Sequence, residues 1–161
     1  MPSFDVVSKL NMQEIDNSIS NSMKEITQRY DFKGSNSKIE RSEKIITITT
    51  EDDLKAKQVL DILNSHIIKR DVDPRSIKLK NSESASGNTI RQTFNLIEGV
   101  DQDVSKKIIS TIKASKMKVQ VKIQGAELRI SGAKRDNLQD AIQIIKDLNI
   151  EIPLQYINFR D

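Results

Sequence analysis

The chain has 161 residues and a formal net charge of +3, with 36% hydrophobic residues, 30% charged residues and no cysteine. The lack of cysteine excludes disulfides, thiolate nucleophiles and thiolate metal ligands, and it fits a reducing compartment. No apolar run approaches the roughly 18 residues of a membrane span, and the start of the chain has no secretory signal pattern, so we expect a cytoplasmic protein of one domain or two small ones.

Helical and strand patterns alternate through the first half of the chain. In residues 11–30 apolar side chains recur every three or four positions, which predicts a helix that begins after Asn11. Residues 50–70 show the same spacing and predict a second helix with Thr50 as its N-cap. Four short segments predict strands around these helices: SFDVV, SKIERS, KIITITT and SIKLK.

The second half repeats this order after a small, polar segment. Residues 81–88, NSESASGN, predict a linker or a long loop. The following segments predict strands: TIRQTFNLI, the hairpin KVQVKIQGAELRIS, and PLQYINF. Residues 101–115 and 134–148 predict the two helices.

Two successive βαββαβ units predict an α+β protein made of two ferredoxin-like sandwiches. Each would be an antiparallel sheet with two helices on one face. We expect domains at residues 1–83 and 88–161. In an alternative arrangement the terminal strands SFDVV and YINF pair with each other, so that the N-terminal strand or helix swaps into the second domain. Periodicity does not decide between the two.

Basic residues are in excess only in the second half. Residues 1–83 contain 14 Lys or Arg and 14 Asp or Glu, whereas residues 84–161 contain 12 and 9. A basic half points to an anionic partner, although many proteins without one carry as much charge.

Strand alternation places cations on the side of the second sheet that faces away from the helices. If strands 90–96, 118–123 and 127–130 share that sheet, its open face carries Arg91, Lys118, Lys122 and Arg129. Cations on an extended face suit phosphate binding. The alternative is an ordinary charged surface exposed to solvent.

Further cations cluster at the ends of predicted helices. Lys113 and Lys116 follow the third helix, and Lys69 and Arg70 follow the second. We include them as secondary candidates for nucleotide binding, although the negative end of a helix dipole also accounts for cations there.

The segment RYDFKG, residues 29–34, holds two of the few aromatic residues. Tyr30 completes the apolar stripe of its helix, which predicts a core residue. Phe32, with Lys33, is a candidate for nucleotide binding by base stacking, and a core position for Phe32 fits the sequence equally. The other close pair, Tyr156 and Phe159, is expected to point to opposite faces of its strand. RNA recognition motifs carry aromatics on their two central strands, and KIITITT has none.

Little in the sequence favours catalysis or metal binding. His66 is the only histidine, and the five glycines form no phosphate-binding loop. The carboxylate pairs Asp52/Asp53 and Asp71/Asp73 have no His or Cys near them in sequence. We therefore expect no catalytic residue, no cofactor and no metal.

Several segments resemble the bacterial YajQ proteins: MPSFDVVS, RYDFKGS, KRDVDPRSIK, DVSKKIISTIKASKMKVQVKIQG and INFRD. The resemblance covers the whole chain. It implies a cytosolic nucleotide-binding protein with two α+β sandwiches similar to RNA-binding domains, and some members bind cyclic di-GMP. It implies no catalytic residue. The matching segments around Arg29–Gly34, Lys69–Arg75 and Lys116–Lys122 are where we expect a ligand.

These observations leave two functional hypotheses. The first is a non-catalytic protein that binds RNA, or a nucleotide such as cyclic di-GMP, through phosphate contacts on a basic sheet face. The second is a protein-interaction adaptor or transcriptional co-regulator whose nucleotide ligand is only an effector. An enzyme is a distant third, and neither a membrane nor a metal is expected as a partner.

Overall fold

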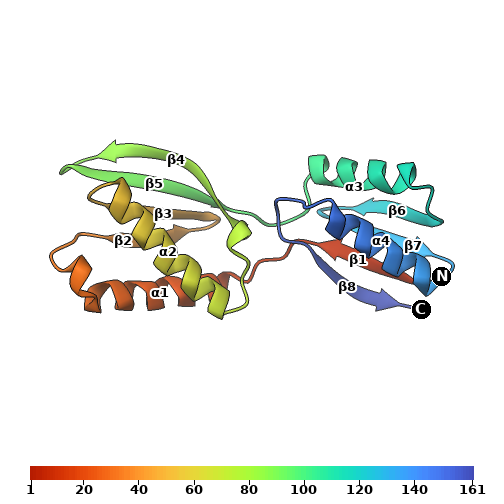
Figure 1. The fold of residues 1–161 in the computed structure, drawn as a ribbon, viewed down its shortest axis with the longest axis horizontal. Coiled ribbons are helices and arrows are strands. Elements are labelled where there is room, and N and C mark those ends of the chain that lie inside the picture. Colours follow the sequence, from red (N-terminus) through yellow and green to blue (C-terminus); the bar gives the residue numbers. More distant parts are fainter. The chain divides into compact units, whose positions relative to one another are not determined.

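The computed structural model describes residues 1–161, which divide into two compact units. Unit 1 combines residues 1–9 with 98–161, and unit 2 comprises residues 10–97. Each unit has a four-stranded antiparallel sheet and two helices, as Figure 1 shows.

Unit 1 has the order strand, helix, strand, strand, helix, strand. Its elements are β1 (Ser3–Val7), α3 (Gln102–Ala114), β6 (Val119–Gln124), β7 (Glu127–Gly132), α4 (Arg135–Asp147) and β8 (Gln155–Arg160). The sheet order is β6-β7-β1-β8, so β1 is a central strand and β8 is an edge. Its core includes Phe4, Val6, Leu128 and Ile130, all with no exposed surface.

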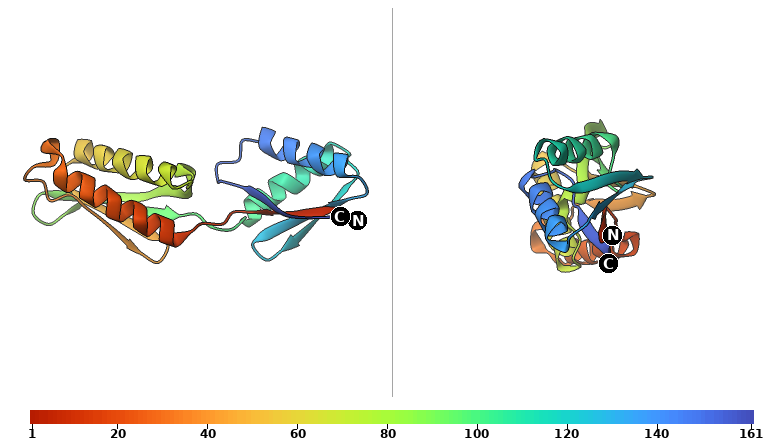
Figure 2. Two further views of the ribbon diagram at one scale, coloured as in Figure 1. Left: turned by 90° about the horizontal axis from the view of Figure 1, so that it is seen from below. Right: turned by 90° about the vertical axis from the view of Figure 1, so that its right-hand side faces the viewer.

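Unit 2 begins with a helix and ends with a hairpin. Its elements are α1 (Met12–Gln28), β2 (Lys38–Ser42), β3 (Ile45–Thr50), α2 (Asp53–Lys69), β4 (Ile77–Ala85) and β5 (Thr89–Leu96). The sheet order is β2-β3-β5-β4, and the two helices lie side by side on one face of the sheet (Figure 2).

Both units have the ferredoxin-like arrangement, which confirms the predicted α+β class. In unit 2, β5 occupies the central position that β1 occupies in unit 1. Because β5 comes last rather than first in its unit, unit 2 is a circular permutation of the βαββαβ order.

The two units are therefore not the contiguous ranges 1–83 and 88–161. Strand β1 pairs with β7 and with β8, which joins the two ends of the chain in one sheet. Residues 81–85 pair with β5 and form the end of a hairpin instead of a linker. These residues are small or polar and mostly exposed. A strand held by its backbone hydrogen bonds in this way leaves no alternating apolar pattern in the sequence.

Helix caps differ from the expectation at one position. Asn11 caps α1 as predicted, because its side chain accepts hydrogen bonds from the backbone N–H of Gln13 and Glu14. In α2 the cap is Asp52, whose carboxylate accepts from the N–H of Lys55. Thr50, predicted to be the cap, is instead the last residue of β3 and is completely buried.

The segment RYDFKG forms a 3₁₀ turn at Tyr30–Phe32 directly after α1. Tyr30 is 88% exposed, so its assignment to the core is wrong, because the helix ends before it at Gln28. Phe32 is buried, and the Lys55 ammonium lies 4.4 Å from the centre of its ring. Lys55 also donates to the carbonyl oxygen of Asp31, which ties the turn to α2.

Glu51 holds the loop that follows this turn. Its carboxylate accepts hydrogen bonds from Ser35 Oγ at 3.0 Å, from the backbone N–H of Asn36 at 2.9 Å and from Thr50 Oγ1 at 2.8 Å. Burial alone would raise the pKa of Glu51, but these hydrogen bonds outweigh it and lower the pKa to about 2. Folding of unit 2 therefore favours the charged form of Glu51.

Division into these units can be tested with fragments. A fragment of residues 10–97 contains every strand of its sheet, and we expect a cooperative thermal transition by circular dichroism. A fragment of residues 1–83 lacks β5, which pairs with both β3 and β4, and we expect no such transition. A cooperative melt of the second fragment with an unfolded first one would contradict the division.

Glu51 gives a pH prediction with a definite sign. Because folding lowers its pKa from 4.5 to about 2, its contribution to stability is complete above pH 4.5 and is lost as the pH falls toward 2. We expect Glu51→Gln to be less stable than the wild type near neutral pH and the difference to shrink across this window. Urea unfolding at a series of pH values measures it. Asp61→Asn, at an exposed position of α2 without an ion pair, is the control for the loss of one surface carboxylate.

Candidate functional site

A row of charged side chains crosses the sheet of unit 1 on the face away from its helices. Lys122 of β6 lies opposite Arg129 of β7, and Arg129 lies opposite Asp5 of β1. Leu128 and Ile130, the neighbours of Arg129, are fully buried. Because side chains alternate along a strand, the charged row belongs to the open face.

Asp5 is the centre of this row, and its carboxylate is almost fully enclosed. The side chain is 2% exposed. It accepts hydrogen bonds from Arg129 Nε at 3.0 Å, from Asn158 Nδ2 at 2.9 Å and from Arg160 Nη2 at 3.1 Å. Burial alone would raise the pKa of Asp5, but these three donors outweigh it and hold the pKa well below its usual range. We call Asp5, Arg129, Asn158 and Arg160 the Asp5 cluster.

A β-bulge in β8 brings two members of this cluster into place. Ser3 pairs with Arg160 and Asp5 with Ile157, so Phe4 alone lies opposite two residues, Asn158 and Phe159. Asn158 has a left-handed backbone with φ of 57°, which asparagine tolerates better than most residues. The extra residue lets Asn158 and Arg160 both reach Asp5.

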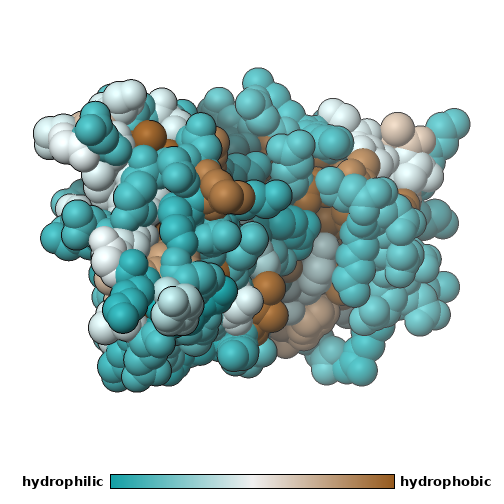
Figure 3. All heavy atoms as spheres, turned by 60° about the vertical axis from the view of Figure 1, so that its left-hand side comes forward, coloured by the Kyte–Doolittle hydropathy of each residue, from teal (hydrophilic) through white to brown (hydrophobic).

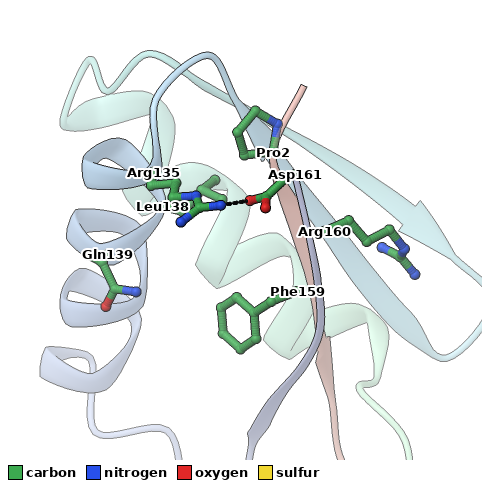
Figure 4. A pocket seen from close by; sticks show the side chains of 7 residues that line it. All are labelled: Pro2, Arg135, Leu138, Gln139, Phe159, Arg160 and Asp161. Atoms are coloured by element: carbon green, nitrogen blue, oxygen red, sulfur yellow. Dashed lines mark ion pairs between the residues drawn. The ribbon is translucent and has the colours of Figure 1, made fainter.

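The bulge also redirects Phe159. The rings of Tyr156 and Phe159 both contact the buried ring of Phe4, with centroid distances of 6.1 and 5.4 Å. The expectation that they point to opposite faces is therefore wrong, because regular alternation stops at the bulge. Figure 4 shows Phe159 and Arg160 extending to opposite sides of β8.

The open face keeps hydrogen-bond donors available for a ligand. Arg129 uses only Nε on Asp5, and its two terminal nitrogens have no partner in the protein. Arg160 is 43% exposed, and its Nε is likewise unused. Lys122 is exposed and makes no ion pair. We call Lys122, Arg129 and Arg160 the basic face. Asp5 and Glu127 place two carboxylates on the same side of the sheet, which leaves these three cations an excess of one positive charge. The guanidinium groups have a geometry that suits phosphate oxygens.

Only part of the predicted set lies on or beside this face. Lys122 and Arg129 are on it, and Lys118 is exposed just before the start of β6. Lys113 is in the last turn of α3, and Lys116 follows that helix with φ of 58°. These two belong to the helix layer and not to the open face.

The other predicted residues belong to unit 2. Arg91 is on β5, in a different sheet from Lys122, so the expectation that the two share one face is wrong. Arg91 also forms an ion pair with Glu83 at 2.8 Å. Phe32 is buried, which leaves no room for a base on its ring, whereas Lys33 is exposed.

Lys69 and Arg70 line a depression of about 480 Å³ in unit 2, between α1 and the end of α2. Its lining also includes Glu14 and Asp71, and Glu14 pairs with Arg70 at 3.4 Å. With two carboxylates beside Lys69 and Arg70, the lining of this depression has no excess of formal positive charge.

Charge is divided more evenly between the units than between the two halves of the sequence. Unit 1 contains 12 basic and 10 acidic residues, and unit 2 contains 14 and 13. The local arrangement around Asp5, and not net charge, therefore distinguishes the candidate site.

No group of His, Cys, Asp or Glu side chains is placed to hold a metal ion. No helix combines the length and apolar character that crossing a bilayer demands.

Sequence reasoning missed Asp5, Asn158 and Arg160. One signal was present: Asp5 is the only charged residue in the otherwise apolar strand SFDVV. A carboxylate buried in a central strand requires compensating donors. With β1 paired to β8, as in the alternative arrangement of the termini, INFRD supplies two of them.

Comparisons with known proteins identify the family of this chain. The family model "Nucleotide-binding protein YajQ-like" matches residues 2–160. A protein of Pelagibacter ubique named nucleotide-binding protein is 52% identical over 161 residues, with 100% of both chains covered. A protein of Paramagnetospirillum magneticum with the same description is 48% identical over the same length, again with both chains fully covered. The chain therefore belongs to the YajQ-like family.

Proposed function

We propose that this protein is a non-catalytic, cytoplasmic binding protein for RNA or for a nucleotide such as cyclic di-GMP, and that the basic face of unit 1 holds the phosphates. One observation carries the proposal: Asp5 fixes Arg129 and Arg160 while leaving N–H groups of both free. The relatives are named nucleotide-binding proteins and not enzymes, which supports the same reading.

The role of Asp5 in this proposal is to orient the arginines. A flexible arginine loses side-chain entropy when it binds a ligand, and prior fixation reduces that cost. Because the oxygens of Asp5 are already occupied by three donors, they are not directed at an incoming phosphate. The cluster therefore has the geometry of a preformed phosphate site, in which the Asp5 carboxylate is bound to the arginines and does not face the ligand.

An adaptor function is the second candidate, and Tyr30 favours it. This aromatic side chain is 88% exposed, although its turn is held by Lys55 and by the Arg29–Asp31 ion pair at 2.8 Å. Figure 3 shows a mostly hydrophilic side of the molecule on which hydrophobic areas are small and separate. A rigid, exposed aromatic residue resembles an interface anchor. Partner capture that survives nuclease and is lost in Tyr30→Ala would support the adaptor.

The basic face predicts a charge-reversal effect. We expect Lys122→Glu to weaken binding of a labelled single-stranded RNA and of cyclic di-GMP by about tenfold, or ~1.4 kcal/mol. Three phosphate contacts give a slope of about −2 for log affinity against log salt with single strands, and losing one contact reduces it by about 0.7. Lys107→Glu on α3 is the matched control and should change neither value. Equal effects of the two variants would exclude this face.

Asp5 gives a prediction that opposes simple charge counting. Asp5→Asn makes the face more positive but removes the charged acceptor that holds both arginines. We expect its RNA affinity to fall several-fold and its melting temperature to drop, because a partner of a buried ion pair is lost. Glu127→Gln removes the same charge from the same face without an arginine partner, and its affinity should hold or rise slightly. Tighter binding by Asp5→Asn would refute the orienting role.

A further inference from the structure

A cavity of about 340 Å³ lies beside the edge strand of unit 1 (Figure 4). Helix α4 contributes Arg135, Leu138 and Gln139 to its lining, and β8 contributes Phe159 and Arg160. The cavity is on the helix side of β8, so the basic face lies across that strand from it.

Phe159 gives the cavity an aromatic wall. Its ring stacks on the buried ring of Phe4 at 5.4 Å with an interplanar angle of 22°, yet the residue remains 56% exposed. Support by Phe4 restricts the orientation of the ring without covering it. An exposed aromatic ring held in this way is a platform on which a planar ligand can stack.

The rim of the cavity is polar. Gln139 carries an amide that can both donate and accept, and Arg135 forms an ion pair with Asp161. An apolar wall with a few donors and acceptors around it is typical of sites for small planar ligands. Nucleobases have the same character, with flat faces and hydrogen-bonding edges.

The bulge of β8 connects this cavity to the basic face. It turns Phe159 toward the cavity and the next residue, Arg160, toward Asp5 on the open face. Since β8 is at the edge of the sheet, no further strand of unit 1 separates the two sides. A ligand with linked phosphate and base groups can therefore pass around this edge.

We propose that the cavity receives a nucleobase of the bound ligand, stacked on Phe159, while Arg160 and Arg129 hold the adjoining phosphate. This inference rests on the proposed function and adds the position of the base. RNA recognition motifs stack bases on the central strands of the open face, where unit 1 has no aromatic residue. The proposed base site lies instead on the helix side of the edge strand β8. A larger base has more area to stack, so purine oligomers are expected to bind more tightly than pyrimidine oligomers.

The test compares two RNA oligomers of equal length: an adenosine heptamer with a central 2-aminopurine, and a heptamer with abasic sites. We expect Phe159→Ala and Phe159→Leu to weaken binding of the adenosine heptamer about tenfold, within the range for stacking on one aromatic residue. Neither should alter binding of the abasic heptamer. Phe159→Tyr should keep the affinity and the quenching of 2-aminopurine fluorescence.

Two controls separate stacking from folding. Phe159→Leu keeps an apolar contact on Phe4 while removing the ring, and thermal melts of every variant check the fold. Tyr30→Ala deletes an even more exposed aromatic residue of unit 2 and should leave both affinities unchanged.

The outcomes distinguish this inference from the proposed function. If Phe159→Leu retains full affinity and quenching while Lys122→Glu weakens both oligomers, the base site is refuted and the phosphate site stands. The same holds if the wild type binds both heptamers equally. If the wild type binds neither RNA nor cyclic di-GMP, the proposed function fails, and the base site fails with it.

Discussion

The buried carboxylate of Asp5 is the interaction on which the candidate site depends. It lies on a central strand, and it is neutralised by donors from the strands on either side, β7 and β8. Because a buried charge is unfavourable without such partners, the side chains of Arg129 and Arg160 are drawn to one place. The position of the basic face follows from this requirement more than from the number of cations in the chain.

The bulge at Asn158 is the backbone counterpart of this constraint. Without the extra residue, Phe159 would follow regular alternation onto the open face, and Arg160 would turn away from Asp5. One left-handed residue thus provides the third donor to Asp5 and directs two neighbouring side chains to opposite sides of β8. The same feature organises the phosphate site that we propose and the base site that extends it.

Local patterns predicted the elements well but not their partners. The four helices, the hairpin near Gly125 and the α+β class were visible because apolar spacing records burial. The sheet to which β1 belongs was not visible in the sequence, since a short apolar strand fits the centre of either sheet. Residues 81–85 were misassigned because an exposed hairpin is held by backbone hydrogen bonds, which side chains do not report. Of the candidate site, alternation located Lys122 and Arg129. It misplaced Arg91, and it could not find Arg160 without the pairing of β1 with β8.

The discontinuity of unit 1 has a consequence for how the chain is made. Synthesis delivers β1 first, but its neighbours β7 and β8 come only after the whole of unit 2. Unit 2 can therefore acquire its fold on the ribosome while β1 still lacks a sheet. In the nascent chain Asp5 lacks two of its three donors until Asn158 and Arg160 have been made. A translation product that stops between Lys146 and Asn158 keeps Lys122 and Arg129 but lacks the donors that β8 supplies to Asp5.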